Sequence, residues 1–340
     1  MMRKVRIATL ILMIPLQVCA QRERYLTLNT TKVRPLAMGG AFTAVGDALS
    51  AIQFNPAGYF FEQTDDIPRL TAFLNPLSPF SGGVNHNELF SGEGSKVDDV
   101  LIGLSLLMKS MSFNFNAVQL GFMLSEESLS LPEVFFEDDV ARVQGFRQNH
   151  SHALVGRLKL ADEVSVGATA NFLFDSSPDE PQKRRSDFGI SYGILLRPEK
   201  GLNIGVLFVN LPDSISQYRL PLERLVDESV NIGVSYELFT KTLFALDVRN
   251  LGEESGMVIR ELHLGIEQVL LSQLALRAGY FNKGKGEHVF SWGLGLVNDS
   301  LLFDFGKKAS RNFYLNYAFV YEKSLAVTNR WHLLSLLIKI

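Results

Sequence analysis

The stretch Phe188–Leu196, "FGISYGILL", alternates large apolar residues with small ones. The large residues are Phe188, Ile190, Tyr192, Ile194 and Leu196, and Gly189, Ser191 and Gly193 stand between them. Successive side chains of a β-strand point to opposite faces. The pattern therefore predicts a strand that is apolar on one face and small or polar on the other.

The same period of two recurs along most of the chain, as in "VNIGVSYEL" (230–238), "LHLGIEQ" (262–268), "FYLNYAFVY" (313–321) and "HLLSLLIKI" (332–340). Fifteen candidate strands follow: 68–76, 97–109, 111–125, 149–161, 162–175, 186–197, 200–211, 228–239, 241–251, 257–269, 271–282, 287–297, 299–307, 311–322 and 329–340. Bacterial single-chain membrane barrels have an even number of strands. We therefore expect fourteen, with 68–76 the weakest candidate because Pro68 and Pro76 interrupt it.

Two architectures produce this alternation. A soluble β-sandwich turns its apolar faces inward, whereas a membrane barrel turns them toward lipid. Three features favour the barrel: uniformly large apolar faces opposite mixed polar ones, aromatic residues near several strand ends, and strands of about 9–13 residues, close to the roughly 9–11 that a tilted membrane strand needs. Long connections at 82–96, 126–146, 175–186 and 211–228 contrast with short turns such as 160–163. We predict an all-β fold, a transmembrane antiparallel β-barrel of about fourteen strands.

The first twenty residues have the layout of a secretory signal peptide. A basic start, "MMRKVR", precedes the apolar run "IATLILMIPLQV", and "VCA" ends in a small residue at Ala20. Cleavage after Ala20 is expected, and the apolar run falls short of the roughly 20 residues of a membrane anchor. Cys19 is the only cysteine, so the processed chain would hold no disulfide; the alternative, a lipid-modified Cys19, is disfavoured by Val18 before it. The net charge of −3 gives no indication of nucleic-acid binding.

The segment that follows, "RPLAMGGAFTAVGDALSAIQFNPAG" (34–58), is rich in small residues. Small residues let one backbone pack closely against another. Asp47 is expected to cap a short helix that begins at Ala48, and Asn55-Pro56 should end it. We interpret residues 21–61 as a hatch that lies inside the barrel formed by residues 62–340; a plain periplasmic arm is the alternative.

The segment 34–58 resembles the N-terminal motif of the FadL-like outer-membrane barrels, a superfamily that includes the PorV-like proteins of type IX secretion. The matching positions are Arg34, Met38, Gly39, Gly40, Ala41, Phe42, Asp47, Asn55, Pro56, Ala57 and Gly58. "LHLGIEQVLLSQLALRAGYFNKG" (262–284) is similar to a strand pair of the PorV-like branch. The likeness covers essentially the whole processed chain, but this chain is shorter than typical members and does not end in Phe.

The resemblance implies a fourteen-stranded barrel in the outer membrane of a Gram-negative bacterium, with a hatch inside. The function it favours is a channel for hydrophobic small molecules, with a fatty acid or hydrocarbon-like ligand and outer-membrane lipid as partners. The alternative is a PorV-like barrel that binds secretion-system proteins and transports nothing.

No residue pattern indicates an enzyme, a metal site or a cofactor. His150 and His152 share a strand face, but zinc sites need three or four donors. The pairs Asp98-Asp99 and Asp138-Asp139 lack the alternating oxygen ligands of a calcium loop.

Charged residues on the polar strand faces are the remaining candidates for a functional site. They are Arg157, Lys159, Glu237, Asp247, Arg249, Glu267, Arg277 and Asp304. Unpaired buried charge is costly, so they should pair with one another or with Arg34 and Asp47 of the hatch. The alternative is that they face a wet lumen.

Overall fold

The computed structural model describes residues 24–59, 69–79, 96–127, 142–143, 149–176, 184–210, 229–238, 241–252, 260–271, 274–284, 287–296, 313–323 and 328–340 of the chain. The predicted signal peptide, 1–20, and Asp304 lie outside these ranges.

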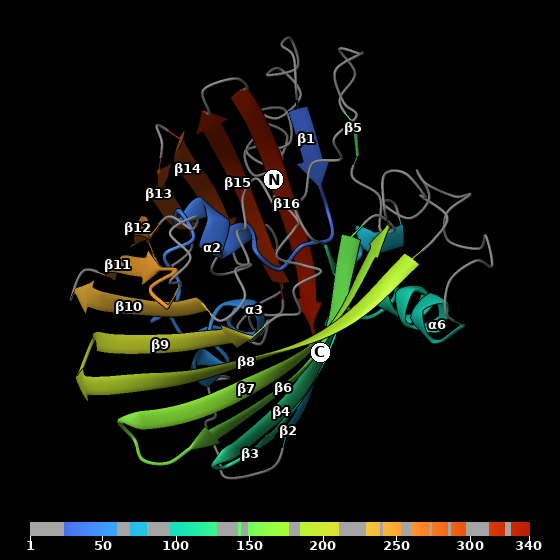
Figure 1. Ribbon diagram of the computed structural model, residues 1–340, viewed down its shortest axis with the longest axis horizontal. Coiled ribbons are helices and arrows are strands. Elements are labelled where there is room, and N and C mark those ends of the chain that lie inside the picture. Colours follow the sequence, from blue (N-terminus) through green and yellow to red (C-terminus); the bar gives the residue numbers. More distant parts are fainter. Residues whose placement is uncertain are drawn as a thin grey trace, which may run out of the picture.

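Fourteen of the sixteen strands close into an antiparallel barrel (Figure 1). They are β2 (Arg69–Leu74), β3 (Ser110–Phe115), β4 (Val118–Glu127), β6 (Asn149–Lys159), β7 (Val164–Ser176), β8 (Arg184–Glu199), β9 (Leu202–Asn210), β10 (Ser229–Leu238), β11 (Thr242–Arg249), β12 (Glu261–Leu270), β13 (Leu274–Gly284), β14 (Glu287–Leu296), β15 (Phe313–Lys323) and β16 (Thr328–Lys339). Each pairs with its neighbour in this order, and β16 closes the ring on β2 through Ile338–Leu74 and Lys339–Phe73.

The apolar faces of these strands point outward. On β8, the exposed side chains include Phe188, Tyr192 and Ile194, whereas Gly193 between them is buried. The same holds on β10, where Ile232 and Val234 are exposed on either side of the buried Gly233. A sandwich would bury these apolar faces, so the structure excludes it and confirms the predicted transmembrane barrel.

The two rims differ in the length of their connections. The short-turn rim carries 116–117, 160–163, 200–201, 239–241 and 271–273, and the long-loop rim carries 75–109, 128–148, 177–183, 211–228 and 250–260. The short connections 285–286 and 324–327 on the long-loop rim and the long connection 297–312 on the other depart from this rule. Outer-membrane barrels have this asymmetry, with the short turns at the periplasmic rim.

Two strand predictions were wrong. One predicted strand is a helix and another is two strands, so the two errors leave the number of strands unchanged. Residues 97–109 were predicted as a strand, but 96–105 form helix α6 (Lys96–Ser105), because their apolar residues also recur every three to four positions. Residues 111–125 were predicted as one strand and form the hairpin β3–β4. The weakest candidate, 68–76, is the barrel strand β2. The candidate 299–307 lies outside the described residues.

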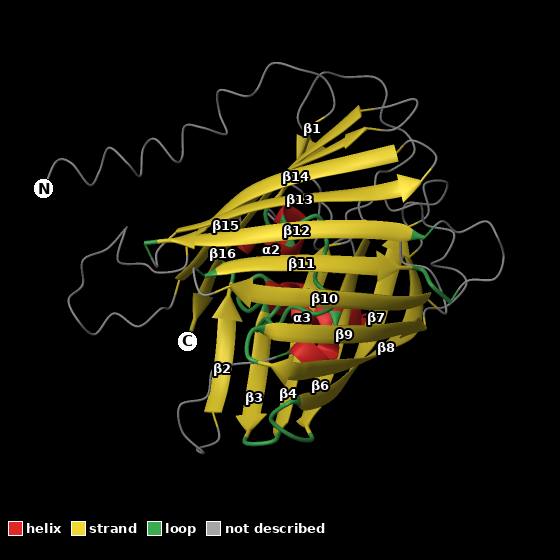
Figure 2. Ribbon diagram, turned by 90° about the vertical axis from the view of Figure 1, so that its left-hand side faces the viewer, coloured by secondary structure: helices red, strands yellow, loops and turns green. Residues whose placement is uncertain are grey.

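The N-terminal part of the chain enters the barrel. β1 (Arg24–Thr27) pairs in parallel with β16, and β5 (Arg142–Val143) pairs in parallel with β1. Helix α2 (Val33–Ala37), helix α3 (Ala51–Phe54) and the 3-10 turn η1 (Pro56–Gly58) follow. Figure 2 shows α2 and α3 inside the ring of strands. α3 begins at Ala51 rather than at the predicted Ala48, although Asp47 accepts the predicted backbone hydrogen bonds, from Ala48 and Ser50. None of the described helices is long and apolar enough to cross a membrane.

Candidate functional site

The candidate site is the surface on which residues 33–59, here called the inner segment, meet the barrel wall. Most of this segment is buried, with Met38, Phe42 and Tyr59 fully inaccessible to solvent. From α2 to Tyr59 it follows the inner wall strand by strand, from β16 back to β4. Its small residues are therefore explained by close backbone packing.

Glycines on the wall strands make this packing possible. A Cβ atom on Gly265 would lie 2.5 Å from the carbonyl oxygen of Met38, and one on Gly279 would lie 2.5 Å from the Cα of Gly39. Such atoms cannot approach so closely, so any side chain at these positions would displace the inner segment. The glycines that face it are Gly121, Gly167, Gly193, Gly205, Gly233, Gly265, Gly279 and Gly293, each on a different strand. We call this set the glycine girdle.

Gly39 and Gly40 have positive φ angles of 63° and 75°, which glycine adopts readily. The turn they form presents the Gly39 amide to Ser291 Oγ at 3.0 Å and the Gly40 carbonyl to the guanidinium of Arg249. His263 Nδ1 lies 2.7 Å from the Gly39 carbonyl oxygen. The Met-Gly-Gly part of the motif thus connects the inner segment to β11, β12 and β14.

Asp247 on β11 binds the next part of the inner segment. Its Oδ2 accepts hydrogen bonds from the backbone amides of Phe42 (2.8 Å) and Thr43 (2.9 Å) and from the Thr43 hydroxyl (2.7 Å). Asp247 is fully buried. Hydrogen bonds to a charged acceptor are roughly twice as strong as neutral ones, so this carboxylate is a principal attachment point.

The Asn-Pro-Ala-Gly part of the motif is attached to β6, β7 and β8. Asn55 Nδ2 donates to the carbonyls of Thr43 (2.7 Å) and Ile194 (3.3 Å), and its Oδ1 accepts from the Ala57 amide (3.0 Å). The Ala57 carbonyl accepts from Arg157 Nε at 2.9 Å and from Ser165 Oγ at 2.8 Å. Pro56 lies against Gly167, and the Gly58 carbonyl accepts the Asp47 amide at 3.0 Å.

A cluster of charges joins Arg34 to the wall. Arg34 donates two hydrogen bonds to Glu267, at 2.7 and 2.9 Å, and its Nη1 lies 3.7 Å from Asp47. Glu267 also pairs with Arg277, which donates to Asn316. Burial alone would lower the pKa of Arg34, but the charges of Glu267 and Asp47 outweigh burial and raise that pKa above its ordinary value. Arg34 therefore stays cationic at any physiological pH.

The other predicted lumen charges do not join this cluster. Lys159 pairs with Asp162 at the short-turn rim, and the Glu237 side chain is exposed near the same rim. His150 and His152 do share a face, with ring centroids 5.3 Å apart and Phe174 packed against both. Within the described part of the chain, no group of three His, Cys, Asp or Glu residues is placed to hold a metal ion. Asp99 lies in α6, and Asp138 and Asp139 lie outside the described residues.

Sequence reasoning missed a buried ion pair at the point where the chain enters the barrel. Lys109 Nζ lies 3.0 Å from Glu126 Oε2 and donates to the carbonyls of Asn29 (2.7 Å) and Ser125 (2.8 Å). Glu126 accepts from the Thr30 hydroxyl at 2.6 Å. Both charged side chains are almost fully buried. Lys109 lies in the 97–109 candidate that was mispredicted as a strand, and no other sequence signal marked the pair.

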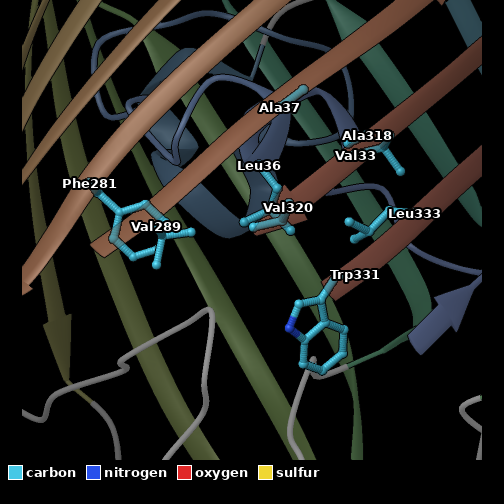
Figure 3. Packing of buried hydrophobic residues seen from close by; sticks show 9 residues of the cluster. All are labelled: Val33, Leu36, Ala37, Phe281, Val289, Ala318, Val320, Trp331 and Leu333. Atoms are coloured by element: carbon cyan, nitrogen blue, oxygen red, sulfur yellow. The ribbon is translucent and has the colours of Figure 1, made fainter. Parts of the chain in front are cut away.

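The inner wall also carries an apolar patch. It consists of Phe281, Val289, Ala318, Val320, Trp331 and Leu333 on β13–β16, together with Val33, Leu36 and Ala37 of the inner segment. Figure 3 shows these side chains gathered on the inner side of the strands around Leu36. The patch reaches from α2 toward the long-loop rim, because Phe281 and Val289 pair near the rim ends of β13 and β14. A second buried apolar cluster lies farther along the inner segment, where Phe73, Met123, Val155 and Leu337 of the wall pack against Leu49, Ile52 and Tyr59. Many other buried inward side chains are polar, such as Gln119, Thr169 and Ser235.

No family model and no curated protein matches this sequence. Among solved structures, it aligns with the CymD monoaromatic hydrocarbon channel at 10% identity, covering 90% of this chain and 94% of that chain, with a TM-score of 0.48. It aligns with the Ralstonia pickettii toluene transporter TbuX at 10% identity, covering 92% and 98%, with a TM-score of 0.47. A triple mutant of the Rhodopseudomonas blastica porin aligns at 8% identity over 68% and 78%, with a TM-score of 0.35.

Proposed function

We propose that this protein is an outer-membrane channel for hydrophobic small molecules and that the inner segment is its hatch. The observation that carries the proposal is the apolar patch on the inner face of β13–β16. A water-filled pore for polar solutes is lined by polar side chains. Every side chain of the patch is buried between α2 and the strands, so in this proposal a hydrophobic guest enters where α2 separates from the wall, and the apolar lining suits a guest that leaves water.

The attachment of the hatch supports the same function. Backbone packing on the glycine girdle, the Asp247 hydrogen bonds and the Arg34–Glu267–Arg277 cluster hold it across the lumen. A hatch held in this way blocks free diffusion of ions and water, and its own Val33, Leu36 and Ala37 form part of the apolar patch. Residues 1–20 act in this proposal as the export signal to the outer membrane of a Gram-negative cell.

The test compares uptake of two labelled probes, toluene and palmitate, into proteoliposomes that contain the full processed chain. Val320→Asp places a carboxylate in the centre of the apolar patch and should reduce uptake of the transported probe by about tenfold, the effect of about 1.4 kcal/mol. Asn316→Asp is the matched control, since it adds a carboxylate to the inner face of the same strand, β15, beside Arg277. It should leave uptake unchanged.

Equal uptake by wild type and Val320→Asp, or by wild type and empty liposomes, would contradict the proposal. A large protein that co-purifies with the solubilised barrel, in the absence of any uptake, would instead favour a partner barrel of a secretion system.

A further inference from the structure

The outer face of the barrel carries a groove that the channel proposal does not use. Its volume is about 800 Å³, and eight outward side chains of β10–β13 line it: Val234, Tyr236, Phe244, Leu246, Leu264, Ile266, Ala278 and Tyr280. None of them is charged. The groove is continuous with the exposed apolar surface of the same strands, which includes Ile232 on β10 and Leu262 on β12.

The floor of the groove is almost bare backbone. Ala245, Gly265 and Gly279 lie side by side across β11, β12 and β13, since Ala245 pairs with Gly265 and Gly265 with Gly279. All three line the groove. On the inner side of the wall, Gly265 and Gly279 contact the backbone of Met38 and Gly39. The groove therefore lies directly opposite the place where the hatch and the wall approach most closely.

Polar groups stand at the end of the groove nearest the long-loop rim. The Tyr280 hydroxyl lies 2.8 Å from His288 Nδ1, and His288 is the cross-strand partner of Lys323. His288 and Lys323 lie on the same outward face, because partners in an antiparallel pair share a face. The Lys323 side chain is exposed. A cation and two hydrogen-bonding groups thus stand beside an uncharged groove.

We propose that this groove binds one phosphate-bearing lipid of the surrounding bilayer, with an acyl chain in the groove and the phosphate at His288 and Lys323. Continuity with the lipid-facing surface favours an occupant that is already dissolved in the membrane. The uncharged lining suits an acyl chain, and the positive charge of Lys323 complements a phosphate. Because the floor of the groove is also the wall of the hatch site, the bound lipid supports the wall from outside where Gly265 and Gly279 carry no side chain.

The test measures lipid phosphorus that stays with the detergent-purified full chain, with native mass spectrometry to identify what is bound. Wild type should retain phosphate-bearing lipid. Ala278→Trp fills the groove from outside and should lower retention by about tenfold or more. Lys323→Glu should lower it by about fivefold, the effect expected from one basic residue at an anionic membrane surface.

Ala168→Trp is the matched control, because Ala168 is an exposed outward alanine on β7, away from the groove. It should retain as much lipid as wild type. Ala278→Leu serves as a milder filling variant if Ala278→Trp does not assemble, and a folded barrel is recognised by faster gel migration before boiling.

Three results at the groove itself would overturn the proposal. They are full retention in both Ala278 variants, equal loss in Ala168→Trp, and a second copy of the chain or another protein in place of lipid on the wild-type barrel. Retention that is unaffected by Lys323→Glu would also overturn it, since the phosphate would then lie elsewhere.

Discussion

At the scale of single residues, the contact between Gly279 and Gly39 shows what the inner segment demands of the wall. We expect Gly279→Ala to lower the free energy of unfolding by about 1–3 kcal/mol, the usual cost of overpacking, because its new Cβ would meet the backbone of Gly39. The measurement is a urea titration of the refolded barrel, followed by the gel shift between folded and boiled protein.

Gly156→Ala is the control for that prediction. Gly156 is also on a barrel strand, but its Cβ would meet only Leu120 Cδ2, at the ordinary distance of 3.5 Å. If Gly156→Ala lowered the free energy of unfolding as much as Gly279→Ala, the loss would come from strand propensity and not from contact with the inner segment.

Residue patterns in the sequence singled out the inner segment, and the structure buries its motif residues against the wall. Arg34, Gly39, Asn55 and Ala57 all contact the wall or one another as parts of one buried segment. The partners on the wall were harder to find. Asp247 and Glu267 were recognised only as lumen charges, since the pairing of β11 and β12 with a segment some 200 residues earlier in the chain leaves no local signal.

At the scale of elements, we expect the inner segment to determine whether the lumen conducts ions. Replacing residues 33–58 with a Gly-Ser linker of the same length should convert a barrel with little ion conductance into one with a large, steady conductance. The physical reason is that a barrel of this size, once emptied, leaves an aqueous space. Single-channel recording in planar bilayers measures it.

The unaltered chain is the reference for that recording. Wild-type channels that already conduct as much as the linker variant would show that the inner segment does not block the lumen. If the linker variant lacks the gel shift of a folded barrel, the intact chain is used instead. It is folded first, cleaved within the inner segment and then recorded.

The errors in predicted elements have local causes. Lys96–Ser105 combines apolar residues at helical spacing with β-compatible Val, Ile and Leu, so a period of two and a period of 3.6 both fit a short window. The β3–β4 hairpin turns at Asn116-Ala117, which lacks the glycine or proline that marks most turns. β2 spans Arg69–Leu74, so neither Pro68 nor Pro76 falls within the strand, where a proline would remove a ladder hydrogen bond.

At the scale of the whole molecule, the strand face that points outward could be predicted from the sequence. The pairing of β2 with β16 that closes the barrel could not. The alternating stretches place most of their large residues on one face, and the structure places that face outside. Val320, Leu333 and Leu337 are exceptions that point inward and are buried. The seam depends on three consecutive residue pairs, Ile338–Leu74, Lys339–Phe73 and Ile340–Ala72, and β1 pairs with β16 at Arg24–Thr27. Nothing in a strand's own sequence states which distant strand it will meet.

A cysteine pair measures whether the glycine-rich segment lies inside the barrel against the inner wall. In a Cys19→Ala background, Thr43→Cys with Asp247→Cys joins two positions whose native side chains are hydrogen-bonded at 2.7 Å. Thr43→Cys with Leu246→Cys is the control, since Leu246 directly precedes Asp247 on β11 and points outward. The measured quantity is the yield of the internal cross-link formed by a short bifunctional thiol reagent in the folded, membrane-inserted protein. We expect efficient cross-linking for the 43–247 pair and little for the 43–246 pair. Equal yields for the two pairs, or no cross-link for the first, would show that the segment does not lie against the inner wall at Asp247.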